Sequence, residues 1–258
     1  MPIYTTEIAS DKISSDNPIH QRLLKAYFLA QPYLNGRLLE VGCGEGRGVE
    51  LLAPRVTEYV AIDKIGNIIK LLRRKHPDIE FIQSRVPPFD DIPTAQFDTV
   101  ISFQVIEHIK NDRLFLEEIY RVLRPGGVAL LTTPNRDKTL TRNPWHEREY
   151  VATELQQLAG GIFDRVDIKG IAGNEKIMEY YYKNKEYVDR ITRFDILNLQ
   201  YRLPAFLLRI PYDIMNRLNR NKLEKDTNEL VASITHEDYQ VTDDADSGLD
   251  LFVILRKS

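Results

Sequence analysis

The 258-residue sequence contains a single cysteine, a single tryptophan and no long apolar run. One cysteine, Cys43, cannot form an intrachain disulfide, so we expect a protein of a reducing compartment and assign it to the cytoplasm. No apolar stretch approaches the ~20 residues that a membrane-spanning helix needs. The N-terminal residues lack a basic segment followed by an apolar one, so the sequence predicts no signal peptide.

The sequence also lacks an excess of basic residues. Lysine and arginine number 35 against 38 acidic residues, which leaves a net charge of −3. Nucleic-acid-binding proteins usually carry a basic excess, so the composition argues against a nucleic-acid partner. A chain of this length can bury a core without disulfides or metals, and it predicts one domain with an elaboration.

Short apolar segments alternate with amphipathic ones through most of the chain. We predict strands at 37–41, 59–63, 79–82, 97–103, 128–133, 163–169 and 249–255, and helices at 17–28, 65–76, 112–123 and 153–158. Strands that alternate with helices over short connections favour a parallel sheet with helices on both faces. We therefore expect an α/β protein with a doubly wound, Rossmann-like sheet, mostly parallel with an antiparallel last strand.

The alternation divides the chain into four parts. Residues 1–36 form an N-terminal helical segment, 37–173 a cofactor-binding core, and 248–258 the last strand of that core. Residues 174–247 are rich in tyrosine and arginine and predict a helical insertion without clear strands. Within it, the apolar segment 205–212 has basic flanks that would suit a membrane surface or an amphipathic substrate. We favour a substrate lid or a homodimer contact over the membrane.

A glycine-rich loop, Gly42-Cys43-Gly44-Glu45-Gly46, follows the first predicted strand. Glycine lacks a Cβ atom and tolerates positive φ, so such a loop lets a ligand approach the backbone closely. Asp63 ends the second strand, where an acid can accept both hydroxyls of a ribose. The loop and this acid together predict an adenosine-containing ligand at the carboxyl ends of the strands.

Two cofactors contain adenosine and fit this arrangement. NAD binding favours the G-x-G-x-x-G spacing, whereas this loop reads Gly42-x-Gly44-x-Gly46. Glu40 lies in the strand before the loop, where its carboxylate would repel a pyrophosphate but attract an ammonium and a sulfonium. The charge pattern therefore favours S-adenosylmethionine over NAD.

Several segments resemble, in order and in spacing, the motifs of class I S-adenosylmethionine-dependent methyltransferases of the small-molecule type. They are LLEVGCGEG (38–46), AID (61–63), FDTVIS (97–102), VIEHI (105–109) and RVLRPGG (121–127). The resemblance extends from about residue 36 to 135, and more loosely to 170. It implies methyl transfer from S-adenosylmethionine to a small-molecule acceptor.

The resemblance also implies a role for individual residues. Around the methionine part of the cofactor it places Glu40, Gly42, Cys43, Gly44, Gly46, Phe103 and Gln104. Asp63 would hold the ribose, with Lys64 and Ile65 near the adenine. Many relatives carry an acid after the third strand that contacts the adenine amino group. This chain has Ser84 and Arg85 at that point, so the adenine contact falls to them or to backbone groups.

His146 is the first candidate for a catalytic base, because a loop histidine that titrates near neutral pH suits that role. It lies in Asn143-Pro-Trp-His-Glu-Arg-Glu-Tyr150, which resembles a segment found in a subset of these enzymes. An equally favoured alternative is that His146 has a structural role and orders the loop that carries it. For His108 we favour a structural hydrogen bond over catalysis, and for Cys43 packing over nucleophilic attack. The five histidines show no ligand spacing, so we expect no metal.

The acceptor is less well defined than the cofactor. The segment around His146 and the large insertion are similar to bacterial enzymes that methylate sugars or other cell-envelope and secondary metabolites. Two alternatives stay open at this point: a non-catalytic cofactor-binding or interaction protein, and an NAD-dependent oxidoreductase.

Overall fold

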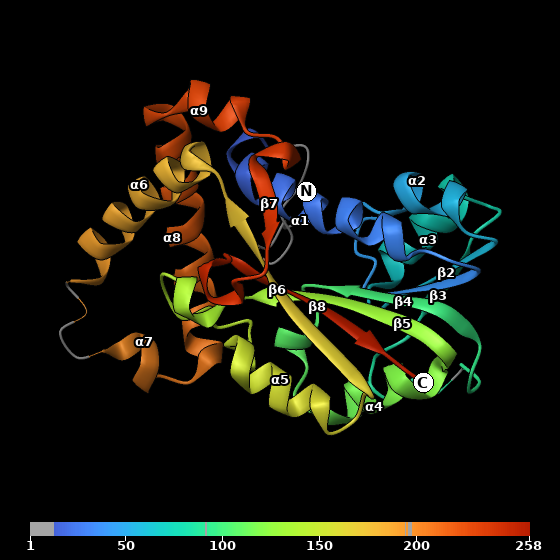
Figure 1. Ribbon diagram of the computed structural model, residues 1–258. Coiled ribbons are helices and arrows are strands. Elements are labelled where there is room, and N and C mark those ends of the chain that lie inside the picture. Colours follow the sequence, from blue (N-terminus) through green and yellow to red (C-terminus); the bar gives the residue numbers. More distant parts are fainter. Residues whose placement is uncertain (1–12, 91, 194, 196–197) are drawn as a thin grey trace.

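A single mixed sheet forms the centre of the computed structural model, which describes residues 13–90, 92–193, 195 and 198–258 (Figure 1). Its strands are β1 (Arg37–Val41), β2 (Glu58–Asp63), β3 (Glu80–Gln83), β4 (Phe97–Phe103), β5 (Leu123–Pro134), β6 (Arg165–Gly173), β7 (Tyr239–Thr242) and β8 (Asp250–Arg256). They are arranged in the order β3-β2-β1-β4-β5-β8-β6-β7. The order reverses direction beside β1, which creates the crevice where open α/β sheets bind ligands.

The first five strands are parallel, and the last strand is antiparallel as predicted. β8 pairs antiparallel with β5 on one side and with β6 on the other. Leu38, Leu39 and Val41 of β1 are fully buried because helices cover both faces of the sheet. Such burial explains the near-continuous apolar strands from which the parallel sheet was predicted.

Helices pack on both sides of this sheet. They are α1 (Asn17–Ala30), α2 (Val49–Leu52), α3 (Gly66–Lys75), α4 (Asp112–Val122), α5 (Ala152–Gly160), α6 (Glu175–Thr192), α7 (Leu199–Arg202), α8 (Ala205–Asp226) and α9 (Asn228–Ser233). α1, α2 and α3 cover one face, and α4 and α5 cover the other (Figure 1). The predicted doubly wound α/β architecture is therefore confirmed.

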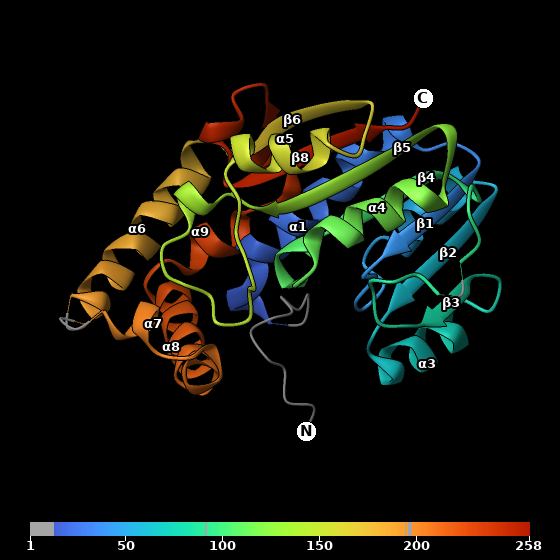
Figure 2. The ribbon, with the colours of Figure 1, turned by 90° about the horizontal axis from the view of Figure 1, so that it is seen from below.

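The helices after β6 extend beyond the end of the sheet. α6, α7 and α8 lie together at one end of the molecule in both ribbon views (Figure 2). α8 is anchored to the start of α1, because the buried carboxylate of Asp16 contacts the guanidinium groups of Arg217 and Arg220, each at 3.0 Å. Within the described ranges, no helix is long and apolar enough to cross a bilayer.

The expectation that residues 174–247 lack strands is wrong for β7. Among the described strands it pairs only with β6, antiparallel, through the four residues Tyr239 to Thr242. Four residues are too short for a clear alternation, and the pairing depends on β6, almost seventy residues earlier. Tyr239 fixes β7 against α1, because its hydroxyl donates a hydrogen bond to the backbone oxygen of Pro18 over 2.7 Å.

A second difference concerns β5. The sequence predicts a turn at Pro125-Gly126-Gly127 and a strand from residue 128, but β5 starts at Leu123 and includes the turn. The pairing with β4 shifts register there, and Gly126 has a φ of 80°. The glycine supplies the left-handed conformation that this irregularity requires.

Candidate functional site

The glycine loop lies between β1 and α2 and has the predicted backbone conformation. Gly42, Gly44 and Gly46 have φ values of 81°, 49° and 78°. A Cβ atom at Gly42 or Gly46 would collide with Val105 or Leu72, whereas one at Gly44 would meet nothing within 4 Å. Gly44 therefore faces open space, where a ligand can approach the backbone.

Asp63 at the end of β2 lies beside this open position. One carboxylate oxygen accepts a hydrogen bond from the backbone N–H of Gly44, and the other accepts one from Ile65, each over 2.9 Å. Each carboxylate oxygen has two lone pairs, so each can accept one further hydrogen bond. The side chain can thus hold the loop and a ligand diol at the same time.

Glu40 is buried beneath the loop. Its carboxylate accepts hydrogen bonds from the hydroxyls of Tyr27 in α1, over 2.7 Å, and Tyr59 in β2. Burial raises the pKa of Glu40, while the hydrogen bonds from Tyr59 and Tyr27 act in the opposite direction. The two tyrosines were not found from the sequence. Contact between Glu40 and the methionine part of a cofactor stays a prediction, because tyrosine hydroxyls already contact both of its oxygens.

The remaining predicted cofactor residues lie around the same strand ends. Gln104 follows β4 with a φ of 57° and lines the cavity described below, while Phe103 packs edge-on against Tyr27. Ser84 donates its backbone N–H to the backbone oxygen of Asp63 over 3.1 Å, which places it next to that acid. Cys43 is buried, and burial raises the pKa of its thiol, which argues against a nucleophile. The roles of Lys64 and Arg85 stay predictions.

A cavity of about 270 Å³ opens at the carboxyl ends of β4 and β5. Gln104, Glu107 and His108 contribute to it from the segment after β4, and His146 and Glu149 from the segment after β5. Side chains of α1, α6 and α8 close the other sides. The cavity adjoins the glycine loop, since Gly42 packs against the residue that follows Gln104.

His146 is held in a fixed orientation inside this cavity. Its Nδ1 lies 2.6 Å from a carboxylate oxygen of Glu149, and its Nε2 lies 2.8 Å from the side-chain nitrogen of Asn143. With Nδ1–H donated to Glu149, Nε2 is left as the acceptor. A histidine oriented by a carboxylate is the arrangement of a general base.

His108 lies against His146, with ring centroids 4.9 Å apart. Its Nδ1 lies 2.9 Å from the backbone oxygen of Trp145, which ties the loop that carries His146 to the end of β4. This contact is a structural hydrogen bond of the favoured kind, and the role of His108 stays a prediction. Potential ligand atoms of Glu107, His108 and His146 lie within 4.8 Å of one another. The spacing of the histidines in the sequence did not predict this cluster. The expectation that the protein binds no metal therefore stays a prediction.

Glu107 was not identified as a site residue from the sequence, although it lies in the VIEHI segment (105–109). Its side chain is buried and accepts a hydrogen bond from the hydroxyl of Thr133 over 3.1 Å. Its backbone oxygen accepts hydrogen bonds from the backbone N–H groups of Glu147 and Arg148, and these bonds fix the loop beside His146. Burial raises the pKa of Glu107 to about 7, so a proton can leave or return near neutral pH.

We expect Glu107→Gln to stabilise the protein at alkaline pH. The folded-state pKa lies above the ordinary value of 4.5, so the folded state binds more protons than the unfolded state between these values. The stability of the unmodified protein therefore falls as pH rises through this window, and glutamine removes that loss. Urea unfolding should show a gain of about 2–3 kcal/mol at pH 8 that shrinks below about 1 kcal/mol at pH 5.

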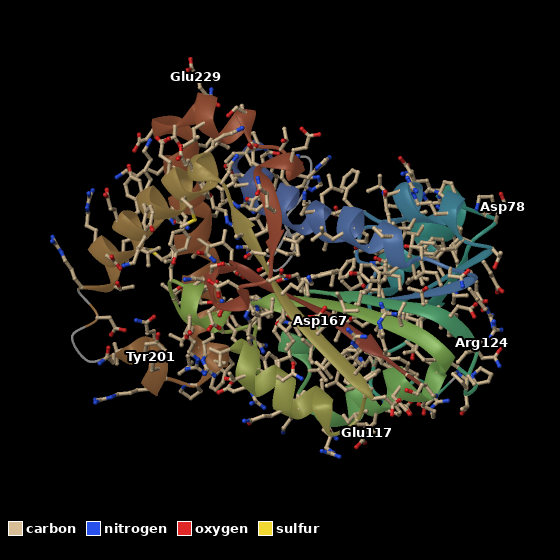
Figure 3. The ribbon with its side chains drawn as sticks, in the orientation of Figure 1. Asp78, Glu117, Arg124, Asp167, Tyr201 and Glu229 are labelled. Carbon is tan, nitrogen blue, oxygen red and sulfur yellow. The ribbon has the colours of Figure 1, made fainter. Side chains whose placement is uncertain are left out.

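The matched control for this experiment is Glu117→Gln in α4. Glu117 lies on the outer surface (Figure 3), where it pairs with Arg113. Its replacement should change the free energy of unfolding by less than about 0.5 kcal/mol at either pH. A Glu107→Gln variant with the same pH dependence as the unmodified protein would show that this carboxyl titrates normally.

Residues 39–131, which begin within β1 and include the glycine loop and β4, match the family of the methyltransferase domain. A probable S-adenosylmethionine-dependent methyltransferase of Mycolicibacterium smegmatis is 37% identical over 126 residues, which cover 47% of this chain and 49% of that protein. These matches identify residues 39–131 as a methyltransferase domain of the class I S-adenosylmethionine-dependent type. S-adenosylmethionine is the cofactor of this family.

Two further comparisons extend beyond this domain. The phthiotriol/phenolphthiotriol dimycocerosates methyltransferase of Mycobacterium tuberculosis is 30% identical over 177 residues, 66% of this chain and 57% of that protein. A S-adenosylmethionine-dependent methyltransferase of Thermotoga maritima shares the fold with a TM-score of 0.59, covering 95% of this chain and 91% of that chain at 13% identity. The chain spans about half the length of the curated relatives it matches.

The residues at the ends of β1 and β2 fit this cofactor. Gly44 leaves open space for it, and Asp63 has acceptor positions left for a ribose diol. The neighbouring cavity then begins at Gln104, where the resemblance places the reactive end of the cofactor. A polar cavity therefore lies beside the loop that fits this cofactor.

Proposed function

We propose that this protein transfers the methyl group of S-adenosylmethionine to a hydroxyl oxygen of a small-molecule acceptor. The observation that carries the proposal is the hydrogen-bonded pair of His146 and Glu149, which lines the cavity next to Gln104. A hydroxyl must lose its proton to become a methyl acceptor, and this pair supplies a base for it.

The cofactor, when bound, supplies a methyl group that is electrophilic because the sulfur carries a positive charge. Glu149 holds the Nδ1–H of His146, so Nε2 is the atom that takes a proton from the acceptor. The acceptor hydroxyl replaces the amide of Asn143 at Nε2, and Asn143 keeps its bond to the backbone N–H of Trp145. Side chains of helices α1, α6 and α8 form the remaining walls of the cavity, which position the acceptor and limit the access of water.

The cavity lining supports a polar acceptor such as a sugar or another cell-envelope or secondary metabolite. Asn184 and Asn219 line the cavity and are joined by a hydrogen bond of 2.7 Å. The side-chain oxygen of Asn219 is buried without a partner among the described residues, so a ligand hydroxyl can donate to it. The relative that methylates phthiotriol-type dimycocerosates also favours a cell-envelope acceptor.

Two measurements test the function. S-adenosylmethionine should raise the melting temperature of the protein, whereas NAD should not. With cofactor labelled on the methyl group, label should then pass to one class of acceptor in a panel of glycosides, polyols and metabolite extracts.

The alternatives predict different results in the same assays. Binding of S-adenosylmethionine without transfer to any acceptor class would favour a non-catalytic binding protein that interacts through α6 to α9. A rise in melting temperature with NAD alone would favour an oxidoreductase. Either outcome would overturn the proposed methyl transfer.

A further inference from the structure

A second cavity of about 180 Å³ lies between α6, α8 and the loop at 141–144. Its walls are largely apolar and include Ile191, Leu208, Pro211 and Met215. Neither the glycine loop nor His146 contributes to it. It is therefore a separate, apolar compartment beside the polar cavity that His146 lines.

The two cavities are adjacent and share walls. Five residues line both of them: Thr141, Val188, Tyr212, Asn216 and Asn219. On one side of this shared wall lie Glu107, His146 and Glu149, and on the other side lie the apolar residues. A molecule that occupies both compartments must therefore have a polar end and an apolar end.

The apolar compartment opens at its rim beside the outer surface of α8. Met215 lines the cavity and is 38% exposed, which places it at the rim. The exposed apolar residues of α8 follow at helical spacing beyond this rim and are Phe206, Leu207, Ile210, Ile214 and Leu218. α7 adds Tyr201, which points outward at the same end of the molecule (Figure 3). The exposed side of Met215 thus marks an opening through which an apolar chain can enter the cavity.

We propose that the cavity between α6 and α8 holds the aliphatic chain of an amphiphilic acceptor whose polar end reaches His146. This inference rests on the proposed methyl transfer and names the substrate class of the same site. The two cavities together fall within the range of roughly 300–1,000 Å³ that is typical of small-molecule sites. Each methylene group buried in the apolar part tightens binding about four-fold.

Trp145 provides a direct probe of this junction. It is the only tryptophan of the chain and lies between Pro144, which lines the apolar cavity, and His146, which lines the polar one. Its indole N–H donates to Asp213 over 3.2 Å, and the guanidinium of Arg209 lies 4.4 Å from its ring centroid. Because both partners belong to α8, a ligand under α8 should change the tryptophan fluorescence.

The experiment compares glucose with butyl, hexyl, octyl and decyl glucosides, each below its micellar concentration, with S-adenosylhomocysteine present. We expect the dissociation constant from Trp145 fluorescence to fall about four-fold per methylene until the cavity is full, with glucose the weakest ligand. Equal affinities along the series would overturn the proposal. The titration is repeated without S-adenosylhomocysteine, so it also tests the cavity if the protein binds no such cofactor.

Two neighbouring residues of α8 offer a matched pair of variants. Leu208 lines the apolar cavity, whereas Leu207 points outward and is 51% exposed. Leu208→Glu should weaken octyl glucoside binding at least about 50-fold and remove the chain-length dependence, because it places a carboxylate in the cavity. Leu207→Glu should change binding less than about two-fold. An equal loss in both variants would place the chain on the outer face of α8 and overturn the proposal.

A second variant covers the case in which Leu208→Glu does not fold. Thr192 lies in α6 on the other wall of the cavity, and Thr192→Phe fills the space without adding charge. In this variant the affinity should stop rising at a shorter alkyl chain than in the unmodified protein. Calorimetry should show unchanged binding of S-adenosylhomocysteine. An unchanged chain-length profile in a folded Thr192→Phe protein would contradict the proposal. If the unmodified protein does not bind S-adenosylhomocysteine, that result would instead count against the proposed methyl transfer.

Discussion

Replacing His146 with glutamine is expected to lower the turnover number about 100- to 10,000-fold, the usual contribution of a general base. The side chain lies in the acceptor cavity, away from the glycine loop and Asp63. The dissociation constant of S-adenosylmethionine should therefore change less than about two-fold. Single-turnover kinetics with labelled cofactor measure the first effect, and calorimetry measures the second.

The variant Glu149→Gln tests the same mechanism through a positioning residue. Glutamine keeps an oxygen within reach of the Nδ1–H of His146 but removes the negative charge that stabilises its protonated form. We expect a smaller loss of turnover, about 10- to 100-fold, together with a shift of the acidic limb of the activity profile to lower pH. The shift follows because the protonated form of His146, which cannot act as a base, loses the stabilisation that the carboxylate charge provides.

A chelator distinguishes the base from a metal ligand. The ligand atoms of Glu107, His108 and His146 lie close enough to hold a cation. If His146 acts as a base, EDTA should leave turnover unchanged. Loss of turnover in EDTA and its recovery with a divalent cation, or normal turnover of His146→Gln, would remove the imidazole from the role of base.

The sheet could be predicted from the sequence because its central strands are buried on both faces. β1 and β4 have the predicted boundaries, Arg37–Val41 and Phe97–Phe103. Such strands form continuous apolar segments between turn residues, and this signal is local. β7 gave no such signal, since it is a short edge strand whose pairing partner is distant in the sequence.

The candidate site could be predicted only in part, for the same physical reason. The glycine loop, Asp63 and His146 stand in motifs whose spacing is visible in the sequence. Glu107 lies within one of those motifs, but the burial that raises its pKa comes from the three-dimensional packing. The cavity between α6 and α8 likewise depends on contacts that no periodic pattern reports, such as those between Asp16 and the arginines of α8.

Asp63→Ala is expected to raise the dissociation constant of S-adenosylmethionine about 100-fold or more. The carboxylate would accept both ribose hydroxyls, and hydrogen bonds to a charged acceptor contribute about 1.5 kcal/mol or more each. The change also removes the two bonds that hold Gly44 and Ile65, so the loop loses its fixed position beside the ligand. Calorimetric titration with the cofactor measures the effect directly.

Asp78→Ala is the matched control, because this acid lies on the outer surface before β3 (Figure 3). It should bind the cofactor with unchanged affinity. Asp63→Asn separates the two roles of the carboxylate, since the amide keeps one acceptor oxygen but presents an N–H group on the other side. We expect it to bind almost as weakly as Asp63→Ala, because the amide nitrogen opposes either the N–H of Gly44 or that of Ile65. Normal cofactor affinity in both variants would show that the ribose is held by other groups.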